Sequence, residues 1–158
     1  GQLAQLGFRV RGWCRHPHGL AGVDSFHGSA GLTDFLRATE ILVCALPLTA
    51  QTCGLLDRGV FAALPTGARL VHMGSRRQCV LPHLLAALDG GQLAHATFDD
   101  TEEPQEPCPL RQHPRVTLTP QVVGRLRPET GAALVARNLQ RWARDEALLD
   151  AVDRARGY

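Results

Sequence analysis

The chain has 158 residues, a formal net charge of +2 and 44% hydrophobic residues. This length supports one hydrophobic core, and a weak, scattered positive charge argues against a nucleic-acid or membrane-surface partner. No apolar stretch is long enough to cross a bilayer. The five cysteines form no Cys-x-x-Cys pair, so we expect reduced, structural thiols in a cytoplasmic protein.

In the first third of the chain, apolar runs alternate with a helical pattern. Residues 8–14 predict a strand that follows the end of a helix, and Gly7 suits the left-handed position at a helix C-terminus. Residues 32–40 predict a helix with Thr33 as its candidate N-cap. Residues 40–46 form a short continuous apolar run before Pro47, which is typical of a buried parallel strand.

The rest of the chain repeats this alternation. Helical patterns are separated from apolar runs by Pro and Gly, and the last helix is long and amphipathic, with Leu134, Val135, Leu139 and Trp142 at helical spacing. The predicted helices cover 57–64, 80–91 and 127–145, and the predicted strands cover 68–73, 93–98 and 115–120. The acidic, Pro-rich stretch at 99–109 predicts a loop.

Strands separated by short helices predict an α/β fold with a doubly wound parallel sheet and right-handed crossovers. Such folds bind ligands outside the carboxyl ends of their strands. Candidate functional residues are therefore sought at the five predicted strand ends, which are 13–15, 46–49, 73–76, 98–100 and 119–121. His16 and His18 are close in sequence, but no further ligand at a useful spacing supports a metal site.

These strand ends resemble those of the D-isomer-specific 2-hydroxyacid dehydrogenases, and most of all the glyoxylate/hydroxypyruvate reductase A type. The resemblance is carried by GFRVRGWCR at 7–15, by ILVCALPLTAQTCGLLDRGVFAALPTGARLVHMG at 41–74, and by LLAALDGGQL, RQHPRVTLTP and the final VDRARGY. It covers essentially the whole chain in register. It implies a Rossmann-type dinucleotide-binding domain that is incomplete at its N-terminus, because the family's substrate domain and Gly-rich phosphate loop precede the segment corresponding to Gly1.

The resemblance implies four cofactor-binding positions. Arg15 follows the second strand of the family's fold, where an acidic residue would bond the 2′-hydroxyl of NAD and an arginine suits the 2′-phosphate of NADP. NADP is therefore weakly favoured over NAD; the alternative is an ordinary surface arginine beside His16 and His18. Pro47 and Thr52 match positions on the nicotinamide-ribose side, although Pro47 also stops a strand and Thr52 is a candidate cap for the next helix. Asp99 matches the aspartate at the carboxamide end of the nicotinamide; the alternative is a turn-forming aspartate.

The family's chemistry uses an arginine that clamps the substrate carboxylate, a histidine that donates a proton, and a glutamate that holds the histidine. In register, Ser75 stands at the arginine position and Arg76 at the following glycine. A serine cannot form a bidentate clamp, and Arg76 or Arg77 is a substitute only if its side chain reaches back. His72, at the preceding strand end, is a candidate replacement acid, although a structural or surface histidine is the simpler interpretation.

The other two catalytic positions fall in the last loops. Glu103, before Pro104, best matches the family glutamate, with Glu102 as the competing choice. Gln121 stands at the family histidine position, and an amide has no proton to donate at neutral pH. His113 is a second candidate replacement, with the same simpler interpretation as a structural or surface histidine. Loss of a general acid lowers rates by about 10²–10⁴, so this chain alone is expected to be inactive or very weakly active.

Two functions remain open at this stage. The first, implied by the resemblance, is NAD(P)H-dependent reduction of glyoxylate or hydroxypyruvate, a small 2-oxoacid, in a homodimer. The second is an inactive or decayed family member that keeps the fold and some nucleotide or dimer binding. The expected organisation is a partial dinucleotide-binding domain at 1–126 and a C-terminal helix and tail at 127–158, which would pack on the substrate domain. Without that partner, the helix should expose an apolar patch around Trp142.

Overall fold

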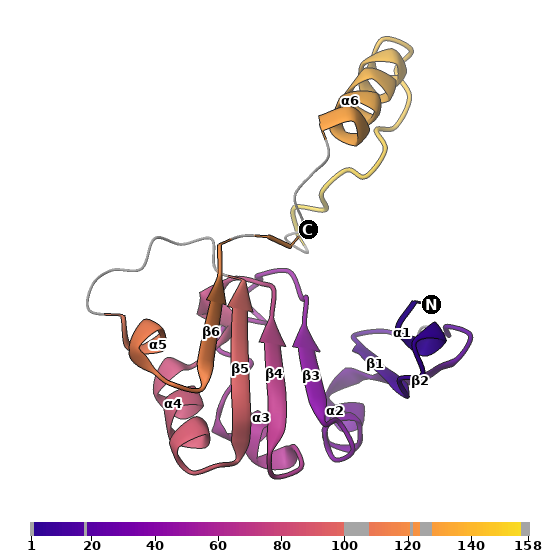
Figure 1. The fold of residues 1–158 in the computed structure, drawn as a ribbon. Helices are drawn as coiled ribbons and strands as arrows, with labels where there is room; N and C mark the ends of the chain where they lie inside the picture. The colour runs from indigo at the N-terminus through magenta and orange to yellow at the C-terminus, as the bar shows by residue number, and fades with distance from the viewer. Residues whose placement is uncertain (1, 18, 100–107, 121, 124–127, 156–158) are drawn as a thin grey trace.

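The computed structural model describes residues 2–17, 19–99, 108–120, 122–123 and 128–155. Helices and strands alternate along these residues, as the apolar runs predict (Figure 1). Their order is α1 (Gln2–Gln5), β1 (Val10–Cys14), β2 (Val23–His27), α2 (Gly28–Leu36), β3 (Ile41–Cys44), α3 (Arg58–Ala63), β4 (Ala68–His72), the 3₁₀ turn η1 (Arg76–Gln78), α4 (Leu81–Asp89), β5 (Leu93–Asp99), α5 (Pro109–Gln112), β6 (Val116–Thr119) and α6 (Pro128–Trp142).

All paired strands are parallel, which confirms the α/β class with a parallel sheet and crossover helices. The described residues nevertheless form two sheets rather than one. Strands β1 and β2 make a two-stranded sheet, and β3, β4, β5 and β6 make a four-stranded sheet in sequential order. Figure 1 shows the smaller sheet beside β3, at one side of the larger one. The edges of β1 and β3 that face each other's sheet therefore have no strand between them in the described chain.

The core lies between the four-stranded sheet and its helices. Leu84 and Leu88 of α4 are fully buried, because residues four apart share one face of a helix. They belong to the same buried cluster as Phe61, Leu70 and Phe98. Burial of a side chain of this size stabilises the fold by roughly 1.5–3 kcal/mol. This cluster fixes the strands whose ends carry the candidate site.

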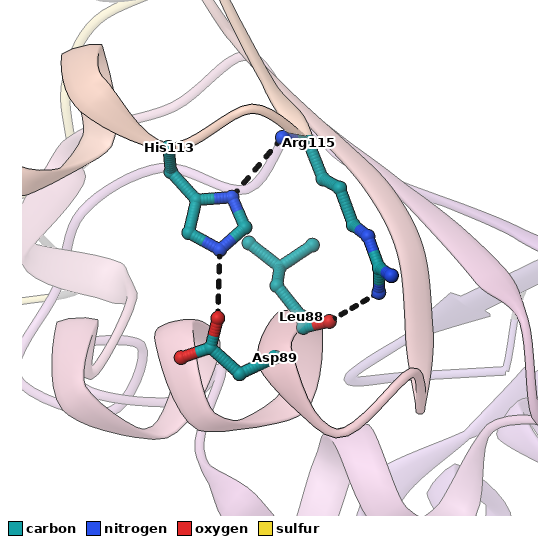
Figure 2. Close-up of polar contacts among 4 residues, drawn as sticks. All are labelled: Leu88, Asp89, His113 and Arg115. Atoms are coloured by element: carbon teal, nitrogen blue, oxygen red, sulfur yellow. Dashed lines mark hydrogen bonds and ion pairs between the residues drawn. The ribbon is translucent and has the colours of Figure 1, made fainter.

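A polar network attaches the end of α4 to the turn before β6 (Figure 2). His113 Nδ1 accepts a hydrogen bond from the backbone N–H of Arg115 at 3.1 Å, so its Nε2 carries the proton and donates to Asp89 Oδ1 at 3.2 Å. Arg115 Nη1 donates to the Leu88 carbonyl at 2.6 Å. The network lies at the amino ends of β5 and β6. His113 is thus on the opposite edge of the sheet from the predicted site, which excludes it as a replacement acid.

The region between β1 and β3 departs most from the sequence prediction. Helix α2 covers Gly28–Leu36 instead of 32–40, and its N-cap is His27, without a side-chain cap bond. The Thr33 cap prediction is therefore wrong, since Thr33 lies inside the helix. Strand β2 was not predicted, because Val23 and Phe26 are its only large apolar residues and it pairs with β1 alone.

Helix α6 lies apart from the sheets in Figure 1. None of its residues is buried, and Val135, Leu139 and Trp142 are exposed, as expected for an amphipathic helix without a partner. The tail folds back on it: Asn138 accepts from the backbone N–H of Leu149 at 2.8 Å and donates to its carbonyl at 3.1 Å. No helix among the described residues is long and apolar enough to cross a membrane.

Candidate functional site

Strands β3, β4, β5 and β6 end at the same edge of the larger sheet (Figure 1). The segments that follow them therefore come together there, as the parallel topology predicts. They comprise residues 45–52 after β3, residues 73–78 after β4, Asp99 at the end of β5, and residues 120, 122 and 123 after β6. In the smaller sheet, β1 ends at Cys14, and Arg15 follows it.

The segment after β3 is a turn closed by two threonines. Thr52 Oγ1 donates to the Pro47 carbonyl at 2.7 Å and accepts from the backbone N–H of Thr49 at 2.8 Å. Thr52 does not cap α3, contrary to the sequence prediction; Asp57 does so by accepting from the backbone N–H of Val60 at 3.0 Å. Pro47 and Thr52 are thus held in one rigid turn at the strand ends.

The side chain of Gln78 holds this turn in place by hydrogen bonds. Its fully buried side chain donates through Nε2 to the carbonyls of Leu46 at 2.9 Å and Pro47 at 3.1 Å. Its Oε1 faces Gly74: a Cβ built on Gly74 would lie 2.1 Å from Oε1 and 3.2 Å from the Leu46 carbonyl oxygen. Only a residue without a side chain fits at position 74 while Gln78 makes these bonds. The two residues together set the distance between the β3 and β4 loops.

Ser75 is the N-cap of the 3₁₀ turn η1, which follows β4. Its Oγ accepts from the backbone N–H of Arg77 at 3.3 Å, so its side chain caps this turn. Arg76 is the first residue of η1 and is partly buried, whereas Arg77 is exposed. Ser75, at the position where the family has arginine by resemblance, therefore has a short side chain that bonds to its own loop. The guanidinium groups of Arg76 and Arg77 follow it in sequence.

Asp99 is 6% exposed and binds the segment that follows β6. Its Oδ1 accepts from Thr119 Oγ1 at 2.6 Å and from the backbone N–H of Val122 at 2.8 Å, and its Oδ2 accepts from Val123 N–H at 2.7 Å. Hydrogen bonds to a carboxylate are stronger than neutral ones. Asp99 thus binds the side chain of Thr119 and the backbone of Val122 and Val123.

His72 ends β4 inside the core. It is 1% exposed and stacks on Phe98, with ring centroids 5.0 Å apart and an interplanar angle of 24°. Its Nε2 is buried without a hydrogen-bond partner among the described residues. Burial lowers the pKa of His72 to about 4, so the imidazole is neutral at pH 7 and carries no extra proton to donate. This placement argues against His72 as a replacement general acid.

Two thiols lie near this edge. Cys44 ends β3 and is buried, and burial raises its pKa. Burial, and secondarily the neighbouring Cys44, raises the pKa of Cys79 to about 12. Both thiols are therefore protonated and poorly nucleophilic at neutral pH. No group of three or more His, Cys, Asp or Glu side chains gathers at metal-binding distance in the described part of the chain.

The remaining predicted positions have different outcomes. Arg15 follows the end of β1 and is exposed. Glu103 and its alternative Glu102, together with Gln121, lie outside the described residues.

Two residues of the site, Gln78 and Gly74, were not predicted from the sequence. The bonds of Gln78 join residues more than thirty positions apart. Gly74 is required because of its contact with Gln78 and not because of a positive φ. No local turn pattern in the sequence therefore indicates its role.

A parallel α/β fold with polar loops gathered at its strand ends is the architecture of dinucleotide-binding domains. The family model for the NAD binding domain of the D-isomer specific 2-hydroxyacid dehydrogenases matches residues 1–122. The chain therefore belongs to the D-isomer specific 2-hydroxyacid dehydrogenase family, which confirms the resemblance inferred from the sequence.

Individual proteins of similar sequence and structure support this family assignment. Glyoxylate/hydroxypyruvate reductase A of Yersinia enterocolitica is 36% identical over 99% of this chain and 51% of its own. A dehydrogenase of this family from Xanthobacter autotrophicus, solved with NADPH and MES, has 38% identity and a TM-score of 0.94, covering 99% of this chain and 66% of that one. The NADPH-dependent glyoxylate/hydroxypyruvate reductase of Sinorhizobium meliloti, solved with NADP and sulfate, has 31% identity and a TM-score of 0.88, covering 99% and 52%. The chain spans about half the length of the curated relative.

Proposed function

We propose that this chain forms the NADP(H)-binding part of a reductase of small 2-oxoacids, with glyoxylate and hydroxypyruvate as its substrates. Arg15 is the observation that carries the cofactor choice. It is exposed at the carboxyl end of β1, where a guanidinium can pair with a 2′-phosphate. NADPH and NADP in the structures of two relatives support this choice.

The rigid strand-end loops support the rest of the cofactor site. Pro47 and Thr52 are held by hydrogen bonds that need no rearrangement on binding, which lowers the entropy lost when a ligand is ordered. Asp99 fixes the neighbouring backbone, and we assign it to the nicotinamide side through that backbone. When bound, the dihydronicotinamide would supply the hydride for reduction of the 2-oxoacid.

Two positions would have to serve the substrate. Ser75 is bonded to the backbone N–H of Arg77 and offers no bidentate contact to a carboxylate, so we assign carboxylate binding to Arg76. Glu103 and Gln121 complete the set by resemblance. Because an amide is not a proton donor, we expect turnover at least about 10²-fold below that of a version with histidine at position 121.

A second function is favoured by the same serine. A chain that keeps the cofactor loops, caps η1 with Ser75 and has no acid at position 121 fits a non-catalytic family member that binds nucleotide. We propose in either case that residues 1–126 form the nucleotide-binding unit, and that 127–158 pack on a substrate domain in a homodimer.

A binding measurement tests the cofactor assignment. NADPH and NADH are titrated into the chain by isothermal titration calorimetry, with Arg15→Ala as the variant and the exposed Arg77→Ala as a matched control. We expect tighter binding of NADPH than NADH, with the difference lost in Arg15→Ala and kept in Arg77→Ala. Equal affinities for both nucleotides in the unaltered chain would contradict the role of Arg15.

A turnover measurement separates the two functions. The chain is joined to the substrate domain and Gly-rich loop of a relative, and NADPH oxidation is followed with glyoxylate and hydroxypyruvate. The comparison is a version with Ser75→Arg, Arg76→Gly and Gln121→His. Turnover only in the altered version would favour the non-catalytic member, whereas comparable turnover in both would support reduction by the residues present.

A further inference from the structure

The side chain of Gln78 fixes one peptide bond in the loop that follows β3. Its Nε2 donates to the carbonyls of Leu46 at 2.9 Å and Pro47 at 3.1 Å. The Pro47 carbonyl also accepts from Thr52 Oγ1 at 2.7 Å. A carbonyl oxygen has two lone pairs, so donors from two different segments occupy both acceptor positions of Pro47. Gln78 and Thr52 together therefore set the direction of this carbonyl.

The same peptide bond has a donor that the described chain does not use. In a planar trans peptide bond, the C=O group and the N–H group of the next residue lie on opposite sides. Because the Pro47 carbonyl is directed to Gln78, the Leu48 N–H is directed away from Gln78. The Leu48 N–H has no hydrogen-bond partner among the described residues, whereas the Thr49 N–H donates to Thr52 Oγ1. Two hydrogen bonds to the carbonyl polarise the peptide group and strengthen this N–H as a donor.

The oxygen at the end of the Gln78 side chain is unfavourably placed. Oε1 is buried and has no hydrogen-bond partner among the described residues, and a buried unpaired acceptor lowers stability. The opposite orientation of the amide would place Oε1 against the Leu46 and Pro47 carbonyls, and none of these three oxygens is a donor. A methionine at position 78 would avoid the unpaired oxygen. The amide is therefore better explained by what its two donors hold than by stability alone.

A second glutamine of the chain, Gln92, makes the same pair of bonds for a structural reason. Its Nε2 donates to the carbonyls of Phe61 at 3.0 Å and Leu64 at 2.9 Å. These carbonyls lie at the end of α3, where helix geometry leaves the last C=O groups without partners. Gln92 directly precedes β5 and so lies at the amino ends of the strands. The carbonyls that Gln78 binds belong instead to an irregular, partly exposed loop at the carboxyl ends.

We propose that Gln78 is a positioning residue for the cofactor. It orients the peptide bond between Pro47 and Leu48 so that the Leu48 N–H donates to a ribose or phosphate oxygen on the nicotinamide side of NADPH. This proposal rests on the proposed function, which assigns Pro47 and Thr52 to that side. Because its side chain is fully buried, Gln78 acts through this peptide bond and not by contact. Its replacement should weaken binding of the nicotinamide half and leave the adenine half, which Arg15 serves, unaffected.

Two ligands separate the halves of the cofactor in calorimetric titrations of the chain. NADPH contains both halves, whereas adenosine 2′,5′-bisphosphate contains the 2′-phosphate but no nicotinamide. The variant is Gln78→Met, which removes both donors and keeps a side chain of similar length. The matched control is Gln92→Met, which removes the same kind of two-carbonyl contact at the opposite edge of the sheet. Circular dichroism verifies that both variants are folded.

We expect Gln78→Met to bind NADPH about tenfold more weakly, the effect of one lost hydrogen bond, and the bisphosphate within about twofold of the unaltered chain. Gln92→Met should change neither affinity by more than about twofold. Equal weakening of both ligands in Gln78→Met, or an equal loss of NADPH affinity in Gln92→Met, would indicate a purely structural role and overturn the proposal. Unchanged NADPH binding by Gln78→Met would overturn it and leave the cofactor assignment intact. Absence of NADPH binding by the unaltered chain would overturn both.

Nuclear magnetic resonance of the unaltered chain gives a test that requires no variant. Saturating NADPH should shift the Leu48 amide proton signal and slow its exchange with solvent, because this N–H becomes hydrogen-bonded. The bisphosphate should leave the signal unchanged. The Thr49 amide already donates to Thr52 and should change little with either ligand. A Leu48 amide that responds to neither ligand would overturn the proposal, and an equal response to both ligands would assign this N–H to the adenine half and overturn it as well.

Discussion

The contact between Gly74 and Gln78 predicts that substitutions at these two positions are strongly coupled. In Gly74→Ala, the new Cβ would meet Gln78 Oε1 at 2.1 Å and the Leu46 carbonyl oxygen at 3.2 Å. The side chain of Gln78 is fully buried and held by two hydrogen bonds, so it cannot move aside without breaking them. The substitution should lower the free energy of unfolding by about 1–3 kcal/mol, as overpacking usually does.

Truncation of Gln78 to alanine should be destabilising for a different reason. Two hydrogen bonds to the Leu46 and Pro47 carbonyls disappear, each contributing about 0.5–1.5 kcal/mol. The truncation also removes the atoms that the Gly74→Ala methyl group would meet at 2.1 and 3.2 Å in Gln78. In the double variant the clash is therefore relieved, and the combined loss should be about 1–2 kcal/mol smaller than the sum of the single losses.

Urea unfolding followed by circular dichroism measures all four corners of this cycle. Gly31→Ala is the matched control, because a Cβ at position 31 would meet nothing closer than 3.5 Å and alanine favours a helix by about 0.5–1 kcal/mol. Gly31→Ala should leave stability unchanged or raise it. Additive losses in the cycle, or a Gly74→Ala chain as stable as the original, would refute the reasoning from this contact.

Three further predictions follow from the site. Because the pKa of His72 is about 4 when folded and near 6.5 when unfolded, the unfolded chain binds the extra proton first as the pH falls. The free energy of unfolding should thus decline between about pH 6.5 and 4, by roughly 3 kcal/mol in total. Urea midpoints measured at pH 7 and 5 should show a smaller decline in His72→Asn than in the unaltered chain. Asp99→Asn should lower the free energy of unfolding by about 1–3 kcal/mol, since an amide cannot accept all three bonds; an unchanged urea midpoint would contradict this. At pH 8, iodoacetamide should modify the exposed Cys53 well before Cys79, whose pKa is about 12, and mass spectrometry of early time points showing Cys79 modified first would be the opposite result.

Local patterns predict the strands of the larger sheet well but do not predict the contacts that shape the site. The apolar run at 40–46 indicates β3, but the predicted burial holds for one face only: Leu42 and Cys44 are buried, whereas Ile41 and Val43 are exposed. Strand β2 has no such run: Phe26 packs against Phe35 of α2, Val23 lies beside Gly12 of β1, and the two residues between them are exposed. The role of Gln78 depends on carbonyls 31 and 32 positions away, and no local pattern can report a partner at that distance.

The resemblance to a family predicts the site positions, and the structure shows what three of these side chains bind. Ser75, Thr52 and Asp99 each spend their hydrogen-bonding groups on the backbone of the loops around them. Substitution there should therefore change stability together with ligand binding. Arg15 is exposed at a strand end, where most substitutions alter stability by less than about 0.5 kcal/mol. If Arg15→Ala loses the preference for NADPH while its stability is unchanged, Arg15 belongs to a nucleotide site. A chain that keeps the fold but binds no nucleotide would have no preference for Arg15→Ala to lose.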